Sequence, residues 1–184
     1  VVHQQVGSIE FYHPQSNSLP SILLEELSKA INHAAHDPEI SVIILRSAGE
    51  KTFCAGASFD ELLSIDNIEK GKKFFQGFAQ VINAIRKCPK FIIARIQGKC
   101  VGGGLGLAAA ADYSIATNNA EIKLSELAVG IGPFVVGPPI ERKIGISAFS
   151  QLAIDATMWR NADWARRRGL FAETHSSIEE MDES

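Results

Sequence analysis

The sequence predicts a layered α/β fold, because short apolar strand patterns alternate with amphipathic helical patterns along most of the chain. The chain has 184 residues, of which 46% are hydrophobic, so it can bury one sizeable core. No internal repeat or low-complexity linker interrupts the alternation. We therefore expect a single domain that spans residues 1–184.

The first ninety residues contain strand patterns at 1–12 and 41–47 and two helical patterns. Residues 1–12 have an extended pattern, and the segment HPQSNS that follows them is typical of a turn. Pro20 starts a helix whose apolar stripe consists of Leu23, Leu27, Ala30, Ile31 and Ala34. Residues 41–47, SVIILRS, show no alternation, which predicts a strand buried on both faces. The next helix ends before Pro89, and its apolar face consists of Phe74, Phe78, Val81, Ile82 and Ile85.

The second half of the chain continues the alternation. Residues 91–98, FIIARIQG, predict another buried strand, which is followed by a helix through Ala111 and by the strand YSIAT at 113–117. Helical patterns around 137–144, 147–157 and 162–168 finish the chain. The chain begins without methionine and ends with the polar segment MDES, so we expect both ends to be trimmed.

Charge and hydropathy argue against two classes of partner. The 18 basic and 21 acidic side chains give a net charge of -3, and no basic tract is present, which argues against nucleic acid and anionic membranes. The segment most similar to a basic tract, ARRRG at 165–169, is short and is typical of a helix end. The longest apolar run, residues 101–111, contains four glycines and is shorter than the roughly 20 residues of a membrane span.

The cysteines and histidines predict neither disulfides nor a metal site. Cys54, Cys88 and Cys100 have no CxxC spacing and are odd in number, so we expect reduced thiols and a cytoplasmic location. His33 and His36 fall at a predicted helix end without further ligands.

Two loops between a strand and a helix carry the first chemical signal. The segments KTFCAGASFDELL (51–63) and QGKCVGGGLGLAAAAD (97–112) both combine small residues with the start of a helix. The first N–H groups of a helix lack partners within the helix. If the two loops converge, two backbone amides face one pocket, which would form an anion or oxyanion site made of main chain.

Three common motifs fail on this sequence. The dinucleotide pattern GxGxxG starting at Gly102 requires glycine where Leu107 stands. The phosphate-loop pattern lacks its upstream glycine before Gly98. The nucleophile elbow GxSxG fails because Ser58 is followed by Phe59 and Asp60.

Three blocks in order, FCAGASFDEL, IQGKCVGGGLGLAAAADYSIAT and AEIKLSELAVGIGP, resemble the crotonase superfamily, also called the enoyl-CoA hydratase/isomerase family. The resemblance implies a crotonase-like spiral core of repeated β-β-α units and an acyl-CoA thioester substrate. It also implies a homotrimer or hexamer, and no cofactor beyond the CoA moiety of the substrate. Members of the family continue with further helices, so we expect a C-terminal helical region to be truncated here.

The resemblance also implies a site. By position, the backbone amides of Ala57 and Gly103 match the oxyanion hole of the family. Gly102 and Gly104 would let the thioester approach closely. The CoA portion would lie along the first block, at Phe53, Ala55, Gly56 and Ser58.

The acid–base positions favour one reaction over another. Hydratases of the family usually carry two glutamates; here Gly106 occupies the first position and Glu126 the second. Hydration needs a group to activate water and a group to protonate carbon, whereas a double-bond shift can use one carboxylate for both transfers. Apolar neighbours such as Leu124, Leu127 and Val129 can desolvate Glu126 and strengthen it as a base. We therefore predict an enoyl-CoA isomerase with Glu126 as its catalytic residue.

Two alternatives stay open. The first is an enoyl-CoA hydratase, including the methylglutaconyl-CoA type, in which Asp60 or Glu61 supplies the missing acid instead of being a solvated first-turn carboxylate. The second is a non-catalytic acyl-CoA-binding or scaffolding member.

Phe134 is the last candidate site residue. It stands where the dienoyl-CoA isomerase branch of the family has an aspartate, and with Pro133 it replaces part of a glycine-rich segment of many hydratases. This predicts an altered acyl pocket that includes Phe134, with a helix-packing aromatic as the alternative. Asp112 matches a family aspartate that we interpret as structural.

Overall fold

The computed structural model of residues 1–184 contains ten strands in two sheets. The larger sheet has the order β1-β2-β3-β5-β7-β10. Its strands are β1 (Val2–His3), β2 (Val6–Phe11), β3 (Val42–Ser47), β5 (Phe91–Ile96), β7 (Tyr113–Thr117) and β10 (Glu173–His175). All neighbouring pairs in this sheet are parallel except β1 and β2.

The smaller sheet has the order β4-β6-β8-β9. Its strands are β4 (Thr52–Cys54), β6 (Lys99–Val101), β8 (Glu121–Lys123) and β9 (Arg160–Asn161). The pairs β4–β6 and β6–β8 are parallel, and β8–β9 is antiparallel. Each of the successive pairs β3–β4, β5–β6 and β7–β8 therefore places one strand in each sheet before the chain enters a helix. This arrangement confirms the predicted spiral of β-β-α units.

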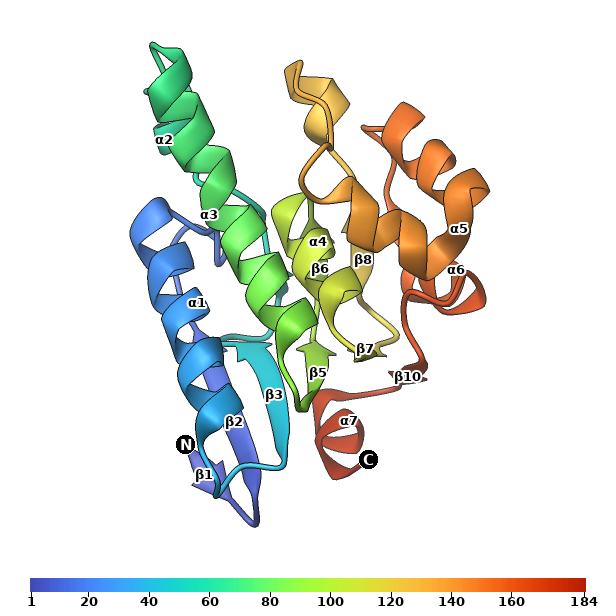
Figure 1. The fold of residues 1–184 in the computed structure, drawn as a ribbon. Helices are drawn as coiled ribbons and strands as arrows, with labels where there is room; N and C mark the ends of the chain where they lie inside the picture. The colour runs from blue at the N-terminus through green and yellow to red at the C-terminus, as the bar shows by residue number, and fades with distance from the viewer.

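Helices cover the sheets and fill the space between them. They are α1 (Ser21–His36), α2 (Phe59–Leu63), α3 (Ile68–Lys87), α4 (Gly103–Ala110), the short 3₁₀ helix η1 (Glu126–Val129), α5 (Gly137–Ile154), α6 (Ala162–Arg167) and α7 (Ile178–Glu183). Helices α1 and α3 pack side by side across the larger sheet (Figure 1). Gly145 has a non-helical conformation inside α5, so the two helical patterns expected there meet at a kink.

The core is one cluster of buried apolar side chains that includes residues of both sheets. Helix α4 lies inside it, because its apolar and glycine residues are buried all around. None of the helices combines the length and apolar character that a membrane crossing requires.

The structure corrects two details of the sequence analysis. Strand β3 is not buried on both faces: its burial alternates, with Ile43 and Leu45 inside and Ile44 half-buried, because α1 and α3 cover one face of the sheet. In α1 the buried stripe starts at Leu24, and Leu23 only packs against its edge.

Candidate functional site

The two glycine-containing loops converge at one edge of the smaller sheet. Strands β4 and β6 are parallel neighbours with Cys54 opposite Cys100, so the chain leaves both strands at the same end. Gly56 has a φ of +93°, and a Cβ placed on it would lie 3.4 Å from the amide nitrogen of Gly103. The loops are thus in direct contact, as the oxyanion hypothesis required.

Two backbone amides face the pocket between these loops without a protein partner. Ala57 lies between two bonds that fix its loop, Leu19 N–H to the Gly56 carbonyl at 2.8 Å and Ser58 N–H to the Leu19 carbonyl at 3.4 Å. Gly103 is the first residue of α4, where amides have no partner within the helix. Neither the Ala57 nor the Gly103 N–H donates to any protein group, and both residues line the same pocket. This pair of free donors can bind a developing oxyanion.

Each glycine before α4 meets a different close neighbour. Gly102 has a φ of +50°, and a Cβ on it would lie 3.0 Å from Oε1 of Glu126. A Cβ on Gly103 would lie 2.2 Å from the Phe78 ring, and one on Gly104 would lie 2.6 Å from Cβ of Cys54. The three glycines therefore permit close packing of the amides against the carboxylate, α3 and β4.

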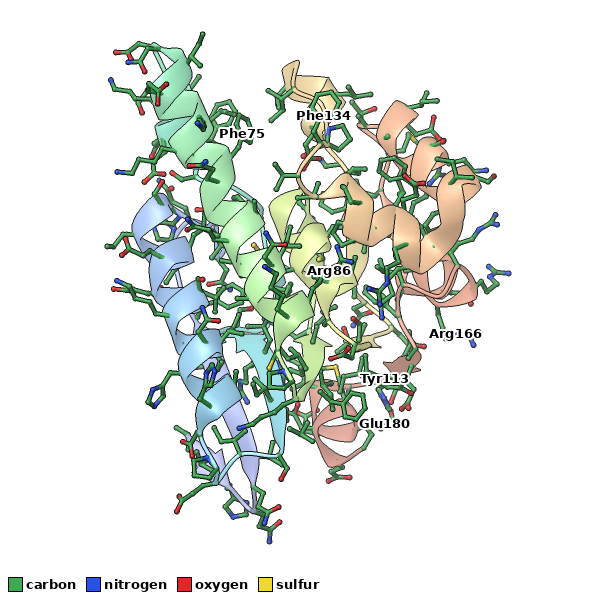
Figure 2. All side chains as sticks on the ribbon, in the orientation of Figure 1. Phe75, Arg86, Tyr113, Phe134, Arg166 and Glu180 are labelled. Atoms are coloured by element: carbon green, nitrogen blue, oxygen red, sulfur yellow. The ribbon has the colours of Figure 1, made fainter.

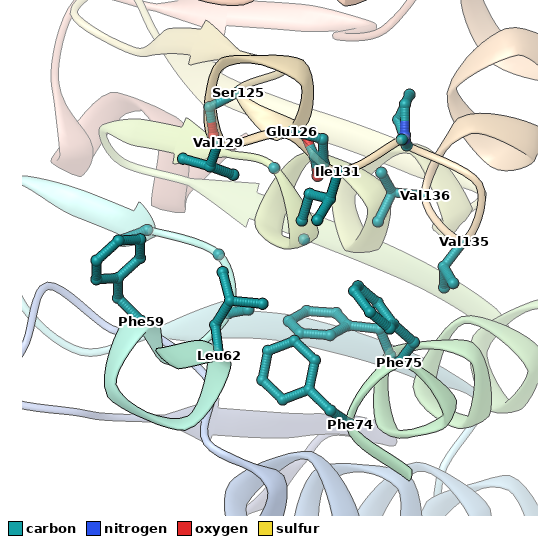
Figure 3. A pocket seen from close by; sticks show the side chains of 18 residues that line it. Phe59, Leu62, Phe74, Phe75, Ser125, Glu126, Val129, Ile131, Val135 and Val136 are labelled. Atoms are coloured by element: carbon teal, nitrogen blue, oxygen red, sulfur yellow. The ribbon is translucent and has the colours of Figure 1, made fainter. Parts of the chain in front are cut away.

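The pocket encloses about 720 Å³ including its open mouth (Figure 3). Side chains from α2 and α3 form one wall, and residues from η1 and the loop before α5 form the other (Figure 3). The apolar side chains beyond alanine are Phe59, Leu62, Phe74, Phe75, Phe78, Val129, Ile131, Pro133, Val135 and Val136.

Glu126 is the only titratable side chain that lines this pocket. It begins η1, and its carbonyl accepts the N–H of Ile131 at 3.0 Å, which closes the turn. Its Oε2 atom is buried and has no hydrogen-bond partner. Burial raises the pKa of the Glu126 carboxyl above its ordinary value. Such a carboxylate is a stronger base than a solvated one.

No second carboxylate reaches the pocket. A Cβ on Gly106 would lie 2.7 Å from Cγ1 of Val136, so this valine fills the space next to residue 106. Asp60 accepts a hydrogen bond from Gln15 Nε2 at 3.2 Å, outside the pocket. Glu61 is also outside, and it accepts hydrogen bonds from the backbone N–H and the hydroxyl of Ser21 at the start of α1. The idea that Asp60 or Glu61 supplies a missing acid finds no support in this geometry.

The Glu61 contacts predict a purely structural role. Replacing Glu61 by alanine removes the acceptor of two hydrogen bonds at the start of α1, so the free energy of unfolding should fall by about 1–2 kcal/mol. Any catalytic turnover by the full-length protein should stay unchanged. Chemical denaturation and a turnover assay check the two parts, with the exposed Asp60→Ala as the matched control. A large loss of turnover in a folded Glu61→Ala protein would return this residue to the list of catalytic acids.

The structure brings most, but not all, of the sequence-predicted site residues to the pocket. Those that line it are Ala55, Gly56, Ala57, Gly102, Gly103 and Glu126. Three others are buried beside it without lining it. Phe53 packs edge-on against Phe11, Ser58 caps α2 by accepting from Glu61 N–H, and Gly104 packs on Cys54.

Phe134 lies outside the pocket, contrary to the sequence-based expectation. Its side chain is 86% exposed, and its ring lies against Gly132, where a Cβ would come within 2.4 Å of the ring. Figure 2 shows it on the loop at the upper end of the molecule. The neighbours Pro133 and Val135 line the pocket instead, because residues 134–136 form a turn that directs successive side chains differently.

Sequence reasoning missed most of the apolar walls. Phe75 comes directly after Phe74 but is not part of the buried stripe predicted for α3. The two rings pack edge to face, with their centroids 5.2 Å apart. A large aromatic beside an apolar stripe is a usable signal of a binding surface. Val135 and Val136 gave no such signal, because their positions depend on the course of a loop.

The remaining motifs are structural. The arginines of ARRRG end α6, where Arg166 and Arg167 pair with Asp163 and Arg168 lies 5.6 Å from the Trp164 ring centroid. Asp112 Oδ2 accepts the backbone N–H of Ile92 at 2.9 Å, which ties α4 to β5. All three cysteines are free, and no cluster of side chains suited to a metal ion is present.

The chain is similar to known proteins of one family. The model of the family "Enoyl-CoA hydratase/isomerase" matches residues 2–183. The short-chain-enoyl-CoA hydratase of Clostridium acetobutylicum is 35% identical over 168 residues, which are 90% of this chain and 64% of that protein. The human mitochondrial methylglutaconyl-CoA hydratase is 34% identical over 167 residues, 90% of this chain and 49% of that protein. The chain thus spans about half to two thirds of the length of these relatives.

Solved structures show the same architecture. The crystal structure of an enoyl-CoA hydratase from Bacillus anthracis superposes with a TM-score of 0.92 at 28% identity and covers all of this chain and 70% of that one. An enoyl-CoA hydratase from Mycobacterium smegmatis has the same TM-score at 27% identity, with 99% of this chain and 70% of that chain covered. With the match to the family model, these findings establish that the chain belongs to the enoyl-CoA hydratase/isomerase family of the crotonase superfamily.

Proposed function

We propose that the full-length protein is an enoyl-CoA isomerase that moves a double bond by proton transfer through Glu126. The observation that carries this proposal is that Glu126 is the sole titratable side chain in a pocket with two free backbone amides. One carboxylate is sufficient for an isomerase, because it can return to the substrate the proton that it removes.

In the proposed mechanism the thioester oxygen of a 3-enoyl-CoA accepts hydrogen bonds from the N–H groups of Ala57 and Gly103. The Glu126 carboxylate removes a proton from the α carbon, and the electron pair forms a dienolate whose negative charge lies on the thioester oxygen. The Glu126 carboxylic acid then protonates the γ carbon and gives the 2-enoyl-CoA. Each oxyanion donor of this kind contributes about 2.7–4 kcal/mol to lowering the barrier, and positioned acid–base catalysis contributes about 10²–10⁴-fold.

The apolar surroundings favour isomerisation over hydration. Hydration needs a bound water and a second group that shares the proton transfers. In this pocket Val136 occupies the space beside Gly106, and the only other side chain with a polar group is that of Ser125. The phenylalanines of α3 line the pocket and would limit the access of water to the proposed dienolate.

The second candidate is an enoyl-CoA hydratase. It is favoured by the names of the relatives, which include the short-chain-enoyl-CoA hydratase of Clostridium acetobutylicum and a probable enoyl-CoA hydratase of Bacillus subtilis. The two candidates differ in product, since hydration gives a 3-hydroxyacyl-CoA and isomerisation does not.

A direct assay separates the candidates. The full-length protein is incubated with a 3-enoyl-CoA and, separately, with a 2-enoyl-CoA, and double-bond migration and water addition are measured by chromatography. We expect migration to exceed water addition by at least about tenfold, because a second acid–base group is worth at least that much. Efficient hydration would instead assign the chain to the hydratases. Tight acyl-CoA binding with neither reaction would support the non-catalytic alternative.

Three further expectations belong to this proposal. The proposed proton transfer requires no cofactor beyond the CoA moiety of the substrate, because no electrons leave or enter it. A homotrimer or hexamer, implied by the family resemblance, stays a prediction that analytical ultracentrifugation of the full-length protein tests. The cytoplasmic location, expected from the unpaired cysteines, also stays a prediction.

A further inference from the structure

The pocket has two apolar walls and no cation. Phe59, Leu62, Phe74 and Phe75 face Val129, Ile131, Val135 and Val136 across it (Figure 3). No lysine, arginine or histidine is among the 18 lining residues. A ligand group bound against either wall therefore meets apolar surface.

The basic residues of the flanking helices are directed elsewhere. Lys70, Lys72 and Lys73 precede Phe74 on α3, but they line a separate polar groove together with Glu69 and Gln76. Lys143 on α5 donates from Nζ to the Asp112 carbonyl at 2.7 Å. None of these ammonium groups lines the pocket.

A carboxylate in this pocket would carry two penalties. It would lose its hydration without gaining a cationic partner, which is among the most costly events in a protein interior. It would also lie in the same enclosure as Glu126, and two carboxylates that share a site repel each other. An uncharged acyl chain meets neither penalty and gains from burial of its CH₂ groups.

We infer that this pocket selects an uncharged, hydrophobic acyl group and rejects acyl-CoA thioesters whose acyl group carries a second, free carboxylate. The inference rests on the proposed function, in that the pocket holds the acyl part of a CoA thioester. It separates this chain from the human methylglutaconyl-CoA hydratase, since a methylglutaconyl group has a free carboxylate. Identity of 34% to that relative thus does not extend to its substrate.

The test measures binding of saturated thioesters, which contain no double bond and so cannot react. Hexanoyl-CoA, adipyl-CoA and the monomethyl ester of adipyl-CoA are titrated into the full-length protein by calorimetry. The ester has the adipyl chain without its charge. We expect hexanoyl-CoA and the ester to bind with Kd values within about fivefold of each other, and adipyl-CoA to bind about 100-fold more weakly, because an unpaired charge is costly to bury.

A variant that adds a cation tests the cause. Val135 is half-buried on the pocket wall, and Val135→Arg would supply the missing partner for the carboxylate. We expect it to strengthen adipyl-CoA binding at least tenfold, whereas Val135→Met, a long uncharged replacement, should not. Thermal unfolding of both variants establishes that they are folded.

The outcomes distinguish the inference from the proposed function. Equal binding of adipyl-CoA and its ester to the unmodified protein overturns the inference and leaves acyl-CoA binding intact. Failure of all three thioesters to bind overturns the proposed function, and the inference with it. Binding of hexanoyl-CoA and the ester but not of adipyl-CoA supports both.

Discussion

Replacing Glu126 by glutamine is expected to lower kcat for double-bond migration by about 10²–10⁴-fold, which is the usual contribution of a positioned general base. Glutamine keeps the size of the side chain but cannot accept the α proton. No other titratable side chain lines the pocket, so no group is in place to substitute for it. The measurement is the steady-state rate with a 3-enoyl-CoA, and KM should change much less than kcat because the carboxylate acts on the reacting carbon.

The pH profile of the unmodified protein gives a second readout. Burial raises the pKa of Glu126, and only its ionised form can remove the proton. Activity should therefore be complete above that raised pKa and should fall as the pH drops through it, with the acid limb above the ordinary pKa of a glutamate. Disappearance of this limb in the residual activity of Glu126→Gln would assign it to this residue.

Two controls accompany Glu126→Gln: its own stability and a substitution of a carboxylate outside the pocket. A carboxyl group whose pKa is raised by folding opposes folding at pH values above its unfolded-state pKa, so Glu126→Gln should be as stable as the parent or more stable at pH 7. The matched control is Glu141→Gln, an exposed carboxylate on α5 that does not line the pocket. Its rate should equal that of the parent. Unchanged migration in a folded Glu126→Gln protein would remove this residue from the mechanism.

Alternating strand and helix patterns were sufficient to predict a layered α/β fold, and the small residues of two strand-to-helix loops suggested that these loops converge. The spiral of β-β-α units was implied by the resemblance to the family. Ala57 and Gly103 lie just after the ends of two parallel strands. The register of β4 and β6, which places Cys54 opposite Cys100, brings those ends together. Glu126 was implied by the resemblance of its block to the family, and the structure places its carboxylate beside Gly102.

Side-chain directions in loops and the partners of distant residues could not be predicted. Val136 fills the space beside Gly106, thirty positions away, and nothing in either local pattern indicates that contact. Phe134 points to solvent and Val135 to the pocket, although both are apolar neighbours on one loop. Val135 and Val136 belong to the apolar wall of the pocket, so substrate preference is the property that is hardest to predict from one sequence.

Removing the N–H group of Gly103 is expected to lower kcat for double-bond migration by about 10²–10³-fold, which is the usual loss for one oxyanion donor. Proline at position 103 would remove this N–H. Gly103 is the first residue of α4, where proline is tolerated because that N–H has no partner in the helix. A Cβ there would meet the Phe78 ring, so Phe78→Ala must accompany the change.

The informative comparison is between two double variants, Gly103→Pro/Phe78→Ala and Gly103→Ala/Phe78→Ala. Both carry a Cβ at position 103 and both lose the aromatic ring, so both bear the stability cost of about 3–5 kcal/mol for that truncation. They differ chiefly in whether residue 103 keeps its N–H. If the amide binds the dienolate, the proline variant should be slower by the full oxyanion factor at similar thermal stability and similar KM. Equal rates would mean that the thioester oxygen is held elsewhere, and that the free amide of Gly103 serves only the packing of α4 against α3.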